Sequence, residues 1–340
     1  MDQDLKIEIS KARPDHVCAI QDFIRTDWKE DHIFVKSRKF FNYQYFTSDP
    51  AFYLAINDQG AIVGLLGYIN YGPEAKNSDI YLSLWKVRQT NDPSLGMKLL
   101  QTLITDLEPR ALHCGGIAKP TIRIYRYLGY STGKLTTSFF PNRKISKFEI
   151  AEISSLPDIS AQVVKSTQSK LVQFEDIDSL AAAYSFDEKT EKTPYKSRPY
   201  IDWRYFKHPV YDYKVYGVLS GERISSYLVT RTLKANGKKS LRIVDFVGEE
   251  MNLRCLHSEL TNLVQGYEFI EFTHAGMDPQ VLREAGFLNA ADCDVTIPLY
   301  YEPFLKKNIE VYYFTTEKKG TRMCLGDGDQ DRPNIWDGNK

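Results

Sequence analysis

Two short segments of this chain resemble each other at a spacing of one domain, and this repeat constrains the fold more than any single motif does. Phe41–Phe46 reads Phe-Asn-Tyr-Gln-Tyr-Phe, and Ile201–Phe206 reads Ile-Asp-Trp-Arg-Tyr-Phe, at an offset of 202 − 42 = 160 residues. A second pair ends each copy, Tyr125–Tyr130 and Leu282–Phe287. One repeat at this spacing predicts a duplicated domain and not a solenoid of short units.

The composition agrees with two ordinary globular domains. The chain has 340 residues, with 44 Lys+Arg and 44 Asp+Glu, so no net charge favours a nucleic acid or an anionic membrane. We divide it into a domain over residues 1–155 and a second over 156–340. An acidic N-terminus and the lack of a long apolar run predict neither a signal peptide nor a membrane span. Five scattered cysteines predict a reducing compartment, so we expect a cytoplasmic protein. We expect it to be a monomer or a homodimer.

Hydrophobic periodicity predicts alternating strands and helices, that is, an α/β fold with a mixed sheet in each copy. The predicted order in the first copy is a strand at 5–10, a helix at 14–28, a hairpin at 51–56 and 61–70, a strand at 79–88, a helix at 96–107, a strand at 112–118, a short helix at 120–128 and a closing strand at 135–140. The second copy repeats this order, with predicted helices at 174–184, 253–263 and 279–285.

This order resembles the Gcn5-related N-acetyltransferase (GNAT) fold, here as two tandem GNAT-like domains. In that family, a Gln/Arg-x-x-Gly-x-Gly/Ala loop opens the central helix and holds the pyrophosphate of coenzyme A with its backbone N–H groups. A helix N-terminus suits this ligand because its free N–H donors and positive dipole end attract anions. The matching positions are Asn91, Ser94, Leu95, Gly96 and Met97, where Ser94 replaces the first glycine and Asn91 the Gln/Arg.

The second copy has Gly248-Glu249-Glu250 at the equivalent loop. Adjacent carboxylates repel a pyrophosphate, so we place coenzyme A, bound as an acyl-CoA co-substrate, on the N-terminal domain alone. The resemblance also implies that the strand carrying Trp85 and Val87 pairs its backbone with the pantetheine arm of the coenzyme. No metal is expected, because the acidic C-terminal stretch lacks the last glutamate of an EF-hand loop.

The resemblance suggests candidates for the catalytic residues. Tyr125, four positions before Gly129, matches the tyrosine that protonates the departing thiolate, and the alternative is a core tyrosine. His32 and Glu74 are our candidates for the base that takes the proton of the amine, and Asp79, also before the central strand, is a further one. A surface role for His32, with a water chain removing the proton, is the alternative.

The resemblance narrows to tandem-GNAT proteins of bacterial surface-polysaccharide synthesis, which include 3-hydroxybutanoyl transferases acting on dTDP-linked 3-amino-3,6-dideoxy sugars. The segments that carry it are Trp28 with Asp31–Ile33, Phe40–Tyr45, Trp85–Val87, Tyr205 with His208-Pro209, and the closing Gly326–Asn334. It implies transfer of an acetyl or 3-hydroxybutanoyl group to the amine of a nucleotide-linked sugar. Cations and aromatic rings suit a nucleotide diphosphate, so we expect the acceptor to be bound by Arg198, Trp203, Arg204, His208 and Arg332. Asp327 or Asp329 is expected to hydrogen-bond the sugar hydroxyls or the amine. A charged strand edge flanking a core tryptophan is the alternative in the second copy, and we expect the closing segment to form an ordered strap.

Two other functions fit the same fold. A Fem-type peptidyltransferase would take its acyl group from aminoacyl-tRNA, although the zero net charge and the lack of a coiled-coil arm argue against this. A non-catalytic scaffold would require that both coenzyme sites have been lost.

Overall fold

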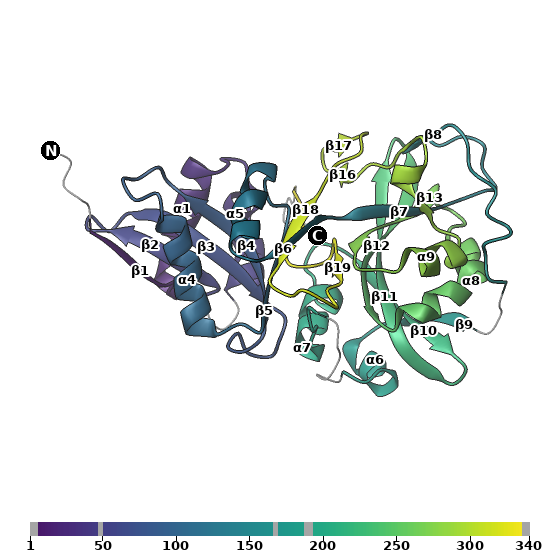
Figure 1. Cartoon of the computed structure of the whole chain (residues 1–340), viewed down its shortest axis with the longest axis horizontal. Coiled ribbons are helices and arrows are strands. Elements are labelled where there is room, and N and C mark those ends of the chain that lie inside the picture. Colours follow the sequence, from purple (N-terminus) through teal and green to yellow (C-terminus); the bar gives the residue numbers. More distant parts are fainter. Residues whose placement is uncertain (1–5, 47–49, 166–168, 187–192, 335–340) are drawn as a thin grey trace.

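The computed structural model describes residues 6–46, 50–165, 169–186 and 193–334. These residues form two large twisted sheets side by side, each flanked by helices (Figure 1). The order of the first sheet is β1-β2-β3-β4-β5-β18-β6. Its strands are β1 (Ile7–Lys11), β2 (Phe52–Asn57), β3 (Ile62–Asn70), β4 (Asp79–Val87), β5 (Ala111–Gly115), β6 (Ser131–Lys134) and β18 (Tyr312–Thr315).

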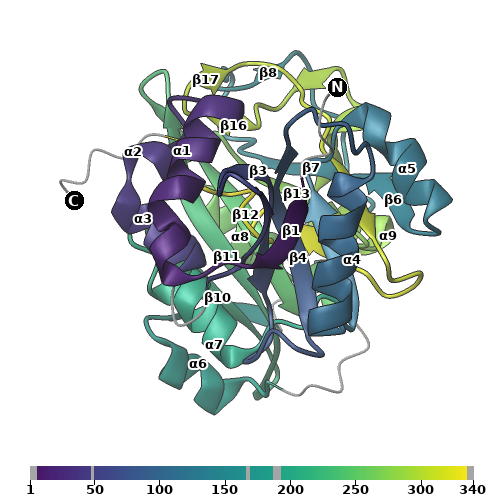
Figure 2. The same ribbon diagram turned by 90° about the vertical axis from the view of Figure 1, so that its left-hand side faces the viewer.

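Helices cover both faces of the first sheet (Figure 2). One face carries α1 (Val17–Asp27), α2 (Ile33–Lys36) and α3 (Arg38–Tyr45), and the other carries α4 (Leu95–Leu107) and α5 (Ile122–Tyr127). Leucines at 95, 99, 100, 103 and 107 are the buried residues of α4, which is the spacing of a helix with one apolar face. The predicted helix at 96–107 is therefore confirmed.

The second sheet has the order β14-β7-β13-β12-β11-β10-β9, and β19 pairs with β13. Its strands are β9 (Ser169–Phe174), β10 (Tyr213–Ser220), β11 (Arg223–Ala235), β12 (Lys238–Gly248), β13 (Phe269–Ala275), β14 (Leu288–Asn289), β7 (Thr136–Pro141) and β19 (Met323–Cys324). Its helical elements are α6 (Ile177–Ala183), α7 (Arg198–Ile201), the π-helical turn η3 (Asp202–Phe206), the 3-10 helix η4 (Glu250–Cys255), α8 (His257–Leu263) and α9 (Pro279–Ala285). Two small two-stranded sheets complete the strands: β8 (Glu152–Ile153) with β15 (Val295–Thr296), and β16 (Tyr300–Tyr301) with β17 (Phe304–Leu305).

Each half of the chain donates one strand to the sheet of the other half. β7 follows β6 in the chain but lies between β13 and β14, where Phe269 faces Pro141 and Leu288 faces Phe139. β18 comes from the C-terminal part and lies between β5 and β6, where Tyr313 faces both Gly115 and Gly133. In Figure 1, β7 runs from the first sheet into the second, and β18 lies beside β6.

This exchange corrects one expectation. The strand predicted at 135–140 forms as β7, but the prediction that it closes the first unit is wrong, because β7 pairs with β13 of the second sheet. The alternation of apolar and polar residues identifies a strand but does not identify the strand it pairs with. The boundary between 1–155 and 156–340 stays a prediction. Any boundary between β7 and β18 leaves β7 of the first half in the second sheet and β18 of the second half in the first sheet.

The two repeated segments contact each other across the centre of the molecule. The Tyr43 hydroxyl donates to the carbonyl of Trp203 at 2.7 Å, and the Trp203 Nε1–H donates to the carbonyl of Tyr43 at 3.3 Å. Their rings stack with centroids 5.1 Å apart. The two residues are equivalent in the repeat, since 203 − 43 = 160. Reciprocal contact between equivalent residues is what an approximate two-fold axis produces.

We expect residues 1–155 and 156–340, expressed separately, to fail to fold, because each fragment leaves the place of one inner strand empty and two strand edges exposed. Co-expression of the two fragments should restore a folded complex. Circular dichroism melts and size-exclusion chromatography measure both outcomes. Cooperative unfolding of either fragment alone would contradict the structural role assigned to the exchange.

Candidate functional site

The central strand of the first sheet offers an unpaired edge. β4 pairs in parallel with β5 only over Asp79–Tyr81, and within the described residues no strand pairs with 82–87 on that side. The pairing of β3 with β4 shifts register between Leu66 and Tyr68, which places a bulge on β4 near Ser83. A bulge twists a strand away from its neighbour. The two strands therefore separate towards their C-terminal ends and expose backbone donors and acceptors that a ligand can pair with.

The second sheet has the same separation, but the chain itself fills it. β12 and β13 pair only over Leu241–Ile243, and β12 also has a register shift, opposite Val229 and Thr230. β19 then lies against β13, with Cys324 facing His274, while the Gly326 N–H donates to the Val244 carbonyl of β12 at 2.6 Å. The stretch 323–326 thus bridges the two diverging strands. A side chain at 326 would not fit, because a Cβ there would lie 2.4 Å from the Tyr205 hydroxyl.

The loop before α4 carries its own anion. Asp92 accepts hydrogen bonds from the backbone N–H of Ser94 at 2.9 Å and from its hydroxyl at 2.5 Å, and it pairs with Lys98 at 2.7 Å. Lys98 and then Ser94 lower the pKa of Asp92 to about 2. A carboxylate therefore occupies the end of α4 at which a pyrophosphate was predicted, and a coenzyme would have to displace it.

The structure brings the predicted coenzyme residues of the first copy together. A Cβ at Gly96 would lie 3.6 Å from Trp85 Nε1 and 3.6 Å from a Val87 methyl, which is ordinary contact. The Tyr125 ring lies 6.3 Å from that of Trp85 and stacks on Phe314 of β18 at 4.2 Å. Leu95, the first residue of α4, is buried, and Met97 is half-buried against the same apolar cluster as Trp85. Asn91 and Ser94 are exposed on the loop.

Tyr125 is 7% exposed, and burial raises its pKa well above the usual range of a phenol. It therefore keeps its proton near neutral pH, as an acid that protonates a thiolate must. The same burial and the contact with Phe314 also fit a core residue, so its catalytic role stays a prediction.

His32 and Glu74, two of the predicted bases, lie in different surroundings. His32 is buried as the N-cap of α2, where its Nδ1 accepts from the Phe34 N–H at 3.2 Å. Burial, followed by Arg332 and Lys29, lowers the pKa of His32 to about 3, which makes it a poor base near neutrality. Glu74 is exposed on the loop between β3 and β4. Of the two, Glu74 is placed to meet a ligand.

Arg204 and His208, two of the predicted acceptor-binding residues, lie inside the second domain. Arg204 is 1% exposed and donates to the carbonyls of Gly326 at 3.2 Å and Asp331 at 2.9 Å. His208 Nδ1 accepts from the N–H of Tyr211 at 2.9 Å, and burial lowers the pKa of His208 to about 2. Both side chains therefore support the fold in this structure.

The predicted residues of the closing segment are also engaged in internal pairs. Asp327 lies 2.7 Å from Lys196, and Asp329 pairs with Arg332 at 2.8 Å. Asp327 and Asp329 are 0% and 3% exposed, so they meet no ligand in solvent. The expected strap is present, and it joins the two halves: Gln330 donates to the Gly115 carbonyl of β5 at 3.2 Å, while Asp331 binds Arg231 of β11 at 2.6 Å.

Trp203 and Glu74 line one cavity of about 700 Å³, the interdomain pocket, between α3, the β3–β4 loop and α7. Arg198 begins α7 next to it and pairs with Asp178 at the surface. The pocket is lined by Lys11, Gln44, Tyr45, Ala51, Tyr68, Ile69, Asn70, Gly72, Pro73, Glu74, Ala75, Lys76, Leu107, Pro199, Tyr200 and Trp203.

Two buried polar groups of this pocket lack hydrogen-bond partners within the described part of the chain. They are the Gln44 amide nitrogen and the Tyr200 hydroxyl, on side chains that are 5% and 3% exposed. Buried polar groups normally have partners, so this pair suggests a place for a bound molecule or water. The Tyr45 hydroxyl also reaches from the pocket wall to Ser83 at the β4 bulge, at 2.9 Å.

Gln44 was not among the residues expected from the sequence, although it lies in the first of the repeated aromatic segments. The contact of Tyr43 with Trp203 brings these segments together, and no spacing rule in one sequence predicts that contact. Among the described residues, no group of three or more His, Cys, Asp or Glu side chains is arranged to hold a metal ion. In the same ranges, every helix is too short or too polar to cross a bilayer.

Two solved structures resemble this one along most of its length. One is a GCN5-related N-acetyltransferase from Anabaena variabilis, 12% identical, covering 91% of this chain and 72% of that chain with a TM-score of 0.54. The other is a conserved protein of unknown function and probable N-acyltransferase from Enterococcus faecalis, 10% identical, covering 91% and 72% with a TM-score of 0.56. No protein-family model and no curated protein matches the sequence. The chain therefore has the GNAT fold, and the predicted fold class is confirmed.

Proposed function

We propose that this chain is an acyl-CoA-dependent N-acyltransferase that uses the first of its two sheets. This proposal rests on one difference between the two sheets: the gap between β4 and β5 is not filled by another strand of the described residues, whereas the gap between β12 and β13 is filled. The unpaired edge of β4 beyond Tyr81 can accept an extended pantetheine arm as an added strand, whereas 323–326 already fills the equivalent place on β12. We expect one coenzyme per chain. The fold shared with N-acetyltransferases supports the reaction class as an analogy.

The proposed reaction needs no covalent acyl-enzyme. The neutral amine attacks the thioester carbon, the C–N bond forms as the C–S bond breaks, and backbone N–H groups near the β4 bulge stabilise the oxyanion. Tyr125 gives its proton to the leaving thiolate. Glu74, directly or through water, takes the proton that the amine loses.

The interdomain pocket is our candidate for the acceptor. Trp203 offers a ring face for a base, Lys11 and Lys76 line the same pocket as cations for phosphates, and Glu74 offers a carboxylate to an amine. These features support the dTDP-linked amino sugar that the sequence resemblance suggests, as a substrate of surface-polysaccharide synthesis. The proposed pocket replaces Arg204 and His208 as the acceptor site.

The Asp92 carboxylate at the start of α4 also favours a second candidate, a scaffold that has lost coenzyme binding. The Asp92→Asn variant separates the two functions, because it removes the charge but keeps an amide oxygen that can cap Ser94. For an enzyme we expect saturable acetyl-CoA binding by calorimetry, one per chain, and roughly fivefold or more tighter binding in Asp92→Asn. Asp106→Asn, at the other end of α4, is the matched control and should bind as the wild type does. Failure of all three proteins to bind would support the scaffold.

Replacing Tyr125 by Phe removes only the hydroxyl that we assign as the acid. We expect kcat to fall roughly 10²-fold with an unchanged KM for acyl-CoA, since ring packing on Phe314 is preserved. The control is Tyr127→Phe on the same helix, whose side chain is 92% exposed. Steady-state release of free thiol measures both variants, and equal rates would show that Tyr125 is structural.

The acceptor pocket is tested by Glu74→Gln, assayed with acetyl-CoA and a dTDP-linked amino sugar. Loss of the carboxylate should raise the KM of the amino sugar at least about tenfold and leave the KM of acetyl-CoA unchanged. Glu222→Gln, on the exposed β10–β11 turn, should behave as the wild type. A wild-type acceptor KM in Glu74→Gln would exclude this pocket while leaving the coenzyme assignment intact.

A further inference from the structure

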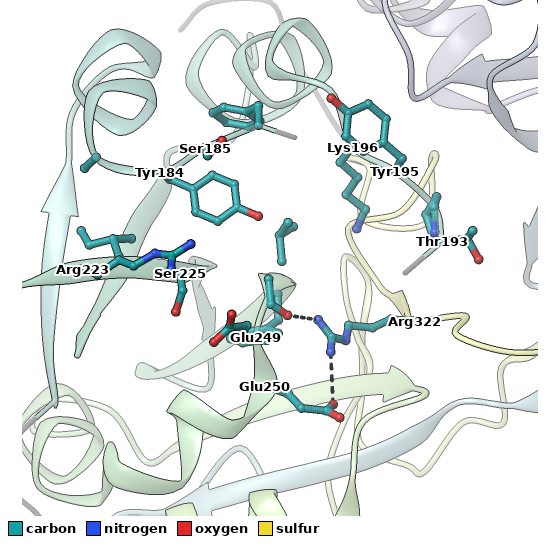
Figure 3. Close-up of a pocket in the computed structure, with 17 residues that line it drawn as sticks. Tyr184, Ser185, Thr193, Tyr195, Lys196, Arg223, Ser225, Glu249, Glu250 and Arg322 are labelled. Carbon is teal, nitrogen blue, oxygen red and sulfur yellow. Dashed lines mark hydrogen bonds and ion pairs between the residues drawn. The ribbon is translucent and has the colours of Figure 1, made fainter. Parts of the chain in front are cut away.

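A second cavity lies at the C-terminal end of β12, far in sequence from the residues proposed to act in acyl transfer. This second-copy pocket has a volume of about 610 Å³. Figure 3 shows Tyr184, Lys196, Arg223 and Arg322 directed towards its middle from four separate segments. It is lined by Ala183, Tyr184, Ser185, Phe186, Thr193, Pro194, Tyr195, Lys196, Arg223, Ile224, Ser225, Phe246, Val247, Gly248, Glu249, Glu250 and Arg322.

The equivalent place in the first copy is closed by side chains. There Arg88, just after β4, forms a two-pronged ion pair with Asp27 at 2.6 and 2.7 Å and covers the Phe23 ring at 5.2 Å. The repeat offset pairs Arg88 with Gly248, since 248 − 88 = 160. Gly248 has φ +96°, and a Cβ there would lie 2.2 Å from the Ser225 carbonyl. The second copy therefore cannot carry a side chain equivalent to that of Arg88 at position 248, and the second-copy pocket stays open.

The inner end of this pocket is rich in hydrogen-bond donors. The Lys196 ammonium lies 2.6 Å from Asp245 and 2.7 Å from Asp327, which leaves one of its three N–H groups for another acceptor. Burial alone would lower the pKa of Lys196, but the two carboxylates raise it overall, so it stays charged. Arg322, 5% exposed, donates to the Gly248 carbonyl at 2.7 Å and pairs with Glu250 at 3.2 Å. Its Nε is buried without a hydrogen-bond partner among the described residues.

The charges around the pocket nearly balance, with three cations against four carboxylates: Lys196, Arg223 and Arg322 against Asp245, Asp327, Glu249 and Glu250. Both buried cations face carboxylates of this chain, and the two remaining charged side chains, Arg223 and Glu249, have opposite signs and no side-chain partner within the described ranges. A pyrophosphate or a polycation would gain little here. Four aromatic side chains, Tyr184, Phe186, Tyr195 and Phe246, supply flat apolar surface. Hydrogen-bond donors that are already paired with carboxylates, and that lie beside aromatic rings, suit an uncharged ligand that accepts hydrogen bonds.

We infer that the second-copy pocket binds an uncharged molecule with a flat ring and a carbonyl or hydroxyl oxygen, which Lys196 and Arg322 meet at the inner end. The site is independent of acyl transfer, because none of its lining residues belongs to the proposed coenzyme site or to the interdomain pocket. It occupies the part of the second copy that β19 leaves free.

Three probes of nearly equal shape test the charge argument: benzamide, benzoate and benzylamine. We expect benzamide to bind the intact chain about fivefold or more tightly than either charged analogue, by saturation-transfer NMR titration. Tightest binding of benzoate or benzylamine, or no binding of benzamide, would overturn the inference.

A pair of alanines on α6 provides the site test. Ala183 lines the pocket and Ala182 does not, although both are exposed at the end of the same helix. We expect Ala183→Trp to weaken benzamide binding about tenfold or more and Ala182→Trp to leave it unchanged. Equal affinities in the two variants would refute the location. Should Ala183→Trp unfold, Ser185→Trp at the exposed rim blocks the same space, and its failure to weaken binding would refute the location equally.

Discussion

The exchange of β7 and β18 is the constraint on which the rest of the molecule depends. Each strand fills an inner place of the other sheet, so neither sheet is complete without both halves. The two halves are therefore held in one relative orientation by backbone hydrogen bonds as well as by apolar packing. That orientation lets Tyr43 and Trp203 bond reciprocally and merges residues of both copies, such as Phe40 and Tyr205, into one core. The interdomain pocket between the repeated segments is a direct consequence.

The closing strap makes the two copies of the fold structurally different. After β18 the chain returns to the second sheet, where β19 pairs with β13 and Gly326 bonds to β12. Its last described turn then buries Asp331 against Arg231 and Arg242. Burial acts against the charged form of Asp331, but the two guanidinium groups lower its pKa overall, so the strap is held by charge near neutral pH. The strap thus fills the gap between β12 and β13 in the second copy, whereas the edge of β4 beyond Tyr81 stays unpaired among the described residues of the first copy.

The sequence predicted the repeated elements well and their partners poorly. Alternating apolar residues at 135–140 indicate a strand, but they cannot say that it crosses to the other sheet, because its hydrogen-bond partners lie more than a hundred residues away. Arg204 and His208 stand among aromatic residues, as in a nucleotide site, yet they bond to backbone groups inside the fold. Gly96, Trp85 and Tyr125 were predictable as a group because local motifs fix their places on one strand and two helices. The exposure of a cationic side chain distinguishes one that can bind a ligand from one that supports the fold, and a single sequence does not reveal that exposure.

Under the proposed function a coenzyme must displace the Asp92 carboxylate, and the charges around Asp92 favour this exchange. Its partners are exposed: the Lys98 side chain is 59% accessible, and surface ion pairs of this kind contribute little to stability. A pyrophosphate would keep the Ser94 N–H and Lys98 as donors, since both already face an anion. It would also bring the pantetheine arm to the unpaired edge of β4, a gain that the carboxylate cannot offer. If the first copy binds a coenzyme as we propose, its phosphate takes the place of the Asp92 carboxylate. The fully buried Asp327 of the second copy, by contrast, cannot leave without breaking an ion pair with Lys196 inside the protein.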